Sequence, residues 1–80
     1  MKNAKIRVDV APGVFKSERS VSFKTEGRSY AMIVDASDIH GNTMNVQVLE
    51  EKNDQVVVAL PREPLNAGRR VTLPKSFLVA

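Results

Sequence analysis

Apolar and polar residues alternate along Lys5–Val10, where three β-branched residues are separated by charged ones. The apolar members are Ile6, Val8 and Val10. A β-strand places successive side chains on opposite faces, so this spacing predicts a strand with one buried row. Pro12 lacks an amide hydrogen and Gly13 permits a turn, so the strand is expected to stop there.

The same alternation predicts a hairpin in the next part of the chain. Ser20–Lys24 and Ser29–Val34 are the two strands, and Thr25–Arg28 is the turn between them. The residues expected on the buried face are Val21, Phe23, Tyr30, Met32 and Val34. Because Ala31 and Ile33 are apolar as well, the second strand is expected to be covered on both faces.

Three more strands are predicted in the second half of the chain. They are Asn42–Glu50, Gln55–Leu60 and Arg69–Leu73, with a polar turn at Glu51–Asp54 between the first two. The inward residues of the two alternating strands are Met44, Val46, Val48, Val71 and Leu73. The apolar run in Gln55–Leu60 is nearly continuous, which is typical of a strand buried on both faces.

These elements predict an all-β fold, a small single-domain barrel of five to six antiparallel strands. The segment Val71–Val79 reads as a strand, a single turn beginning at Pro74 and a short last strand, and this order is similar to the end of an SH3-like barrel. That resemblance concerns topology and implies no function. An OB-like barrel is the alternative, but it needs a helix for which only the short segment Ala36–His40 is available.

Length and composition agree with one soluble domain. The chain has 80 residues, 42% of them hydrophobic and 26% charged, and no linker divides residues 1–80. Cysteine is absent, which excludes disulfides and thiolate metal sites. The beginning of the chain, Met1–Lys5, is polar and basic, and no apolar stretch approaches the roughly 18 residues of a membrane span. We therefore expect a cytoplasmic protein that does not enter a membrane.

The net charge of +3 conceals an uneven distribution of charge. Residues 1–30 carry seven basic and three acidic groups, residues 31–60 carry one and five, and residues 61–80 carry four and one. Spatial pairing of the first and last segments would give the molecule a basic side. The basic face expected from such pairing consists of Lys5, Arg7, Arg69, Arg70 and Lys75.

No motif for catalysis is present. His40 is the only histidine, and Asp35 and Asp38 are too few partners for a metal site, which needs three or four ligands. The surrounding segment is expected to be a solvated turn region. No phosphate-binding glycine pattern or nucleophile motif occurs either. We expect neither an enzyme nor a cofactor.

Two binding functions fit the remaining features. The first is an interaction with an unidentified protein through exposed loops, with Phe15, Lys16, Arg19 and Leu65 as contact residues. The second is binding of RNA or single-stranded DNA by the basic face, although Phe15 is the only ring not assigned to the core. The sequence leaves both the partner and the choice between monomer and homodimer open.

Overall fold

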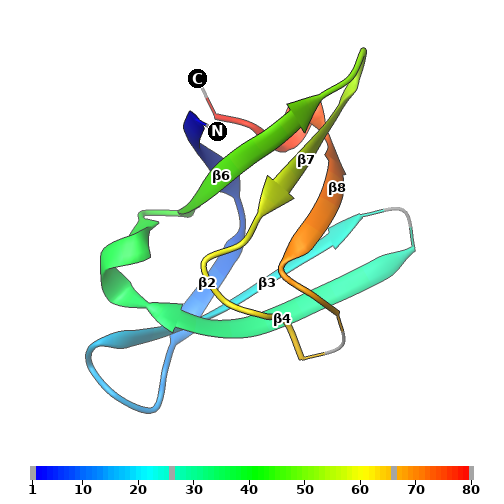
Figure 1. Cartoon of the computed structure of the whole chain (residues 1–80). Helices are drawn as coiled ribbons and strands as arrows, with labels where there is room; N and C mark the ends of the chain where they lie inside the picture. Colours follow the sequence, from blue (N-terminus) through cyan, green and yellow to red (C-terminus); the bar gives the residue numbers. More distant parts are fainter. Residues whose placement is uncertain (1, 26, 66, 80) are drawn as a thin grey trace.

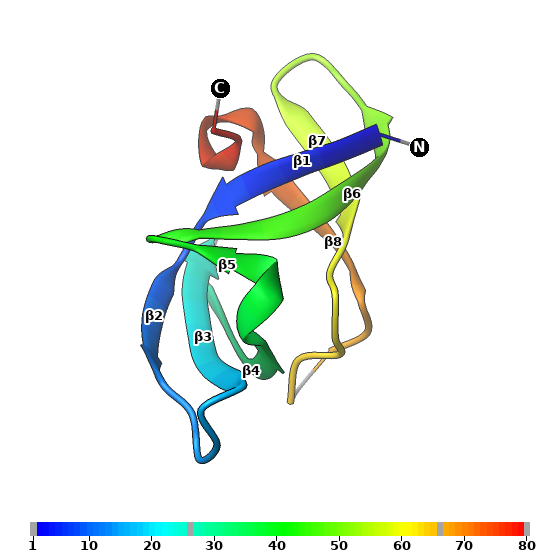
Figure 2. The same cartoon turned by 90° about the vertical axis from the view of Figure 1, so that its left-hand side faces the viewer.

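The first strand of the protein bends at Val8 and contributes to two antiparallel sheets. The computed structural model describes residues 2–25, 27–65 and 67–79. In it, β1 (Lys2–Arg7) and β2 (Asp9–Pro12) are separated by Val8 alone, whose amide nitrogen donates to the carbonyl oxygen of Asn42 at 2.9 Å. β1 belongs to one sheet and β2 to the other, so the bend joins the two layers of the fold (Figures 1 and 2).

The smaller sheet has the strand order β2-β3-β4, with β3 (Glu18–Thr25) in its centre and β4 (Arg28–Asp35) at its edge. Thr25 pairs with Arg28, which confirms the predicted hairpin turn. Gly27 in this turn has a φ of 77°, a left-handed conformation that glycine adopts without strain.

The larger sheet has the strand order β1-β6-β7-β8, and β5 pairs with β6 beside this path. The other strands of this sheet are β5 (Ile39–His40), β6 (Thr43–Glu51), β7 (Gln55–Ala59) and β8 (Arg70–Pro74). Two single turns of 3₁₀ helix lie outside the sheets, η1 (Ala36–Asp38) before β5 and η2 (Lys75–Phe77) after β8. All pairings in both sheets are antiparallel, so the expectation of an all-β antiparallel fold is confirmed.

The core is formed by the alternating apolar rows. The predicted inward residues Ile6, Val8, Val21, Phe23, Tyr30, Met32, Val34, Met44, Val46, Val48, Val71 and Leu73 are all buried, and Val10 is half-buried. β7 is the central strand covered on both faces, because Val56, Val57 and Val58 are all buried. Burial of this apolar surface is the main source of stability in a domain of this size.

Two predictions about the strands are wrong. Ala31 and Ile33 are exposed, and Ile33 retains 39% of its surface, so the outer face of β4 is not covered at these two residues. The described residues also form eight strands instead of five to six. The difference arises because the bend at Val8 divides the first strand and because Ile39–His40 pairs briefly with β6.

The segment after β8 closes back onto β1. Pro74 precedes η2, as predicted, and Leu78 then forms an isolated antiparallel bridge with Ile6. The ring of Phe77 lies edge-on to the ring of Phe23, with their centroids 6.1 Å apart. In the described part of the chain, no helix is long and apolar enough to cross a membrane.

Candidate functional site

The loop between β2 and β3 exposes two neighbouring apolar side chains. Val14 is 87% exposed and Phe15 is 65% exposed. Lys16, which follows them, is exposed as well. The tip combines an aromatic ring, an aliphatic side chain and a positive charge, and aromatic rings are enriched where proteins contact one another.

Backbone hydrogen bonds fix the conformation of this loop. The amide nitrogen of Glu18 donates to the carbonyl oxygen of Phe15 at 3.0 Å, which closes a tight turn. The amide nitrogen of Ala36 donates to the carbonyl oxygen of Ser17 at 2.7 Å, which ties the loop to the end of β4. The segment is therefore an ordered excursion anchored at both ends, and Phe15 is presented in a defined position.

The side chain of Arg19 also stabilises the conformation of this loop. Its Nη1 donates to the carbonyl oxygens of Lys16 and Glu18, both at 2.8 Å. The residue is half-buried and lies on the inward-facing row of β3. The structure thus gives Arg19, predicted as a contact residue, a role in positioning Phe15 and Lys16. A shallow hollow of about 600 Å³ lies beside this loop, lined by residues 10–16 and Arg19.

Leu65 lies in the loop between β7 and β8, at the edge of the smaller sheet. Its amide nitrogen donates to the carbonyl oxygen of Ala31 on β4 at 3.0 Å, and the neighbouring Pro64 is buried. The side chain of Leu65 is nevertheless 87% exposed. The β7–β8 loop and the β2–β3 loop both lie toward the lower end of the molecule in the two orthogonal views (Figures 1 and 2).

The five predicted basic residues fall into two groups. Nη1 of Arg7 donates to the carbonyl oxygen of Ser76 at 3.0 Å, and the carbonyl oxygen of Lys5 accepts from Val79 at 2.9 Å, so these two residues meet the segment that contains Lys75.

Arg69 and Arg70 lie instead at the opposite end of β8. That strand is three positions from β1 in the sheet, or roughly 14 Å at the usual strand spacing. The structure therefore divides the expected basic face, because the last segment, and not β8, pairs with β1.

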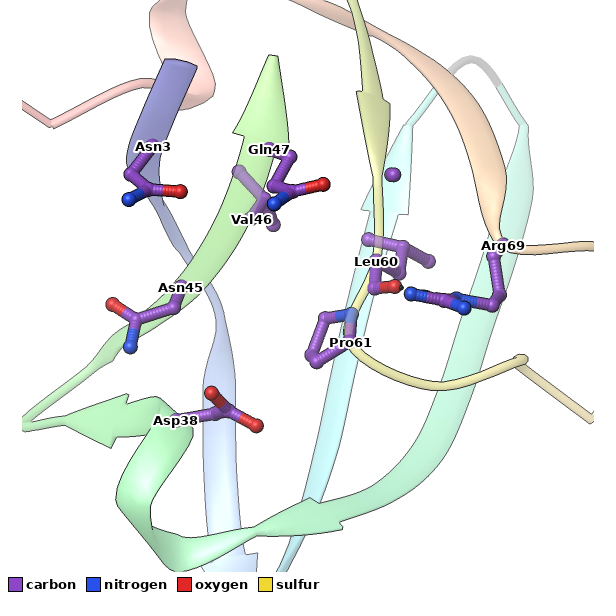
Figure 3. A pocket seen from close by; sticks show the side chains of 9 residues that line it. Asn3, Asp38, Asn45, Val46, Gln47, Leu60, Pro61 and Arg69 are labelled. Atoms are coloured by element: carbon purple, nitrogen blue, oxygen red, sulfur yellow. Dashed lines mark hydrogen bonds between the residues drawn. The ribbon is translucent and has the colours of Figure 1, made fainter. Parts of the chain in front are cut away.

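A groove of about 410 Å³ opens on the outer face of the larger sheet, between β6 and the chain that leaves β7 (Figure 3). The side-chain amides of Asn3, Asn45 and Gln47 line it, and its apolar lining comes from Val46, Ala59, Leu60 and Pro61. Asp38 and Arg69 contribute one negative and one positive charge from different sides of the groove.

The convergence of these groove residues was missed in the sequence. Asn45 and Gln47 are the outward members of an alternating strand, a pattern that indicates only exposure to solvent. Asn3 becomes their neighbour because it pairs with Gln47 across β1 and β6. Such a register between distant segments has no local signal in the sequence.

The acidic segment before β5 is a capped turn. The Oδ1 atom of Asp35 accepts from both the amide nitrogen and the hydroxyl of Ser37, each at 3.0 Å. These hydrogen bonds, with a smaller contribution from the charge of Arg62, hold the pKa of the Asp35 carboxyl below its ordinary value. His40 is exposed, and no group of three or more possible metal ligands forms among residues 2–25, 27–65 and 67–79.

Comparisons with known proteins add no family to this description. No family model matches the chain, and no curated protein or solved structure matches it either.

Proposed function

We propose that this protein is a non-enzymatic interaction module that binds another protein through the β2–β3 loop. The observation that carries the proposal is the exposure of Phe15 and Val14 on a loop held by four hydrogen bonds to backbone carbonyl groups. A loop whose backbone is already held by hydrogen bonds loses less conformational entropy on binding than a flexible one.

We also propose that the two sheets form a small SH3-like barrel. Support comes from the strand that bends into both sheets, the 3₁₀ turn after Pro74 and the bridge between Ile6 and Leu78. A barrel of this kind is a rigid support from which a loop projects, and such loops carry binding residues more often than the strands do.

The chemistry of the β2–β3 loop indicates the kind of partner. Phe15 and Val14 require an apolar pocket, and Lys16 beside them favours a pocket with acidic residues on its rim. Burial of an aromatic side chain at the centre of an interface is a frequent source of affinity. The partner expected is therefore a folded protein with an apolar cavity and an acidic border.

The experiment is an affinity capture from a native lysate, compared between the wild type and single variants. Phe15→Ala is expected to lose the captured partner, and Leu65→Ala, at a side chain of even greater exposure, is the matched control. Thermal melts verify that both variants are folded. Retention of the same partner by Phe15→Ala would refute the proposal. If only Leu65→Ala lost the partner, the binding surface would be the β7–β8 loop instead.

A second proposed function is binding of RNA or single-stranded DNA. The Arg7 guanidinium donates to the last turn, Lys75 begins that turn and the backbone of Lys5 bonds to the segment after it; none of the three has a carboxylate partner within the described residues, where the one ion pair joins Lys2 and Glu51. Three cations on one surface would bind phosphates with a pronounced dependence on salt.

Fluorescence anisotropy with a labelled oligonucleotide tests this second function. Affinity is expected to fall in Arg7→Gln and as salt increases, whereas Arg70→Gln, which belongs to the separate group, is expected to have less effect. Absence of binding at low salt would exclude the nucleic-acid function without affecting the protein-binding proposal.

A further inference from the structure

The groove on the larger sheet has hydrogen-bonding groups without a partner in the part of the chain that the structure describes. Within the described residues, none of the amide side chains of Asn3, Asn45 and Gln47 donates to or accepts from another residue. Each amide offers two donors and one acceptor oxygen. Three adjacent amides therefore present both kinds of partner, which matches the alternating N–H and C=O groups of a peptide main chain.

Two opposite charges face the same groove without neutralising each other. The ion pair between Lys2 and Glu51 is the one found among residues 2–25, 27–65 and 67–79, so Asp38 and Arg69 lie too far apart to pair. A purely anionic ligand would gain from Arg69 but would also meet Asp38, and a purely cationic ligand has the reverse difficulty. The arrangement favours a ligand that carries both charges.

A hydrogen bond fixes the side chain of Arg69, and a capped turn places the backbone of Asp38. Nε of Arg69 donates to the carbonyl oxygen of Leu60 at 2.9 Å, and the amide nitrogen of Leu60 donates to the carbonyl oxygen of Arg69 at 2.8 Å. This leaves the two terminal nitrogens of the guanidinium for a ligand carboxylate. Asp38 is the last residue of η1, the turn capped by the Asp35 carboxylate, and it is half-buried.

From these observations we infer that the groove binds a short free peptide in its zwitterionic form. The peptide ammonium group lies at Asp38, its carboxylate lies at Arg69, and its main-chain amides bond to Asn45 and Gln47 beside the half-buried apolar residues Ala59 and Pro61. The volume of about 410 Å³ is within the range of small-molecule sites. This site is distinct from the β2–β3 loop, so it adds a ligand to the proposed function and does not depend on it.

The test is a titration followed by NMR chemical shifts, with triglycine as the probe. Triglycine is expected to shift the side-chain amide signals of Asn45 and Gln47 and the Nε–H signal of Arg69 in a saturable manner. Acetyl-triglycine lacks the ammonium group and triglycine amide lacks the carboxylate. Each is expected to bind about fivefold more weakly than triglycine, the factor of one exposed ion pair.

Variants assign the two charges. Asp38→Asn is expected to weaken the binding of triglycine about fivefold but to leave the binding of acetyl-triglycine unchanged. Arg69→Gln is likewise expected to weaken the binding of triglycine but to leave the binding of triglycine amide unchanged. Asp54→Asn and Arg70→Gln are matched controls outside the groove, and Phe15→Ala should bind triglycine normally.

The ligand analogues keep the proposal falsifiable even if a groove variant does not fold, because they use the wild-type protein. Absence of saturable shifts at about 10 mM triglycine would overturn the inference, since that concentration detects even millimolar affinity. Equal binding of triglycine and its amide, or of triglycine and acetyl-triglycine, would also overturn it, because the ligand would then need only one charge.

Discussion

Leu78, near one end of the chain, forms an antiparallel bridge with Ile6, near the other. Ile6 is fully buried, and the amide nitrogen of Val79 donates to the carbonyl oxygen of Lys5 at 2.9 Å. The last segment therefore extends the larger sheet beyond the free edge of β1. It also covers apolar surface that the strands alone would leave in water.

Deletion of residues 77–80 is expected to lower the melting temperature substantially. Phe77 and Leu78 are half-buried against the core, and their loss together costs on the order of 2–4 kcal/mol. For a domain of this length, this corresponds to at least about 10 °C in a thermal melt followed by circular dichroism. Leu78→Ser is a milder variant if the truncated chain does not fold. An unchanged melting temperature in both would show that the tail is not part of the fold.

Met32 and Ile33 are adjacent on β4 but face opposite sides, and their substitution is expected to have very different effects. Met32 is buried in the core and Ile33 is 39% exposed. Met32→Thr leaves a cavity with a hydroxyl in it and should cost at least about 2 kcal/mol. Ile33→Thr keeps the β-branched shape and should change the free energy of unfolding by about 0.5 kcal/mol or less. Chemical denaturation measures both, and equal losses would contradict the assigned faces.

Gly13 and Gly68 form another matched pair. A Cβ atom at Gly13 would lie 2.8 Å from the carbonyl oxygen of Glu18, whereas nothing lies within 4 Å at Gly68. Gly13→Ala is therefore expected to distort the β2–β3 loop and to destabilise the protein by about 1 kcal/mol or more. Gly68→Ala should be neutral or slightly stabilising, because alanine restricts the unfolded chain. Thermal melts should therefore show a lower melting temperature for Gly13→Ala and an unchanged or slightly higher one for Gly68→Ala.

The pKa of the Asp35 carboxyl should lie below its ordinary value and should rise in Ser37→Ala. The main cause of the lowering is the hydrogen bond from the Ser37 amide, followed by that from its hydroxyl, and only the hydroxyl is lost in the variant. A lowered pKa stabilises the folded state above the unfolded pKa, and this contribution disappears as pH falls through the folded pKa. An NMR titration of the carboxyl carbon gives both values. Identical titration curves for the wild type and Ser37→Ala would exclude the hydrogen bond from the Ser37 hydroxyl to the Asp35 carboxylate.

The buried rows could be predicted because alternation is a local property of a strand. Val21 and Phe23 alternate with polar residues in the sequence, and both are buried, because alternate side chains of a strand share a face. Ile33 was assigned wrongly because apolar character alone does not create a covering layer. Its burial depends on whether another element covers the outer face of β4, and Ile33 retains 39% of its surface there.

The candidate sites were less predictable because they depend on contacts between distant segments. Exposure of Phe15 followed from its position in a loop without a strand pattern. The positioning role of Arg19 did not follow, because it depends on the path of the backbone around its guanidinium. The separation of Arg70 from Lys5 depends on the strand order of the larger sheet, which the spacing of residues along the chain does not determine.

The bend at Val8 makes the two sheets one cooperative unit. Since a single continuous stretch of backbone supplies the end strand of the smaller sheet and the end strand of the larger one, both sheets lose a strand together when that stretch detaches. Amide hydrogens in β3 and in β7 should consequently lose their protection from exchange at the same denaturant concentration, as members of one folding unit.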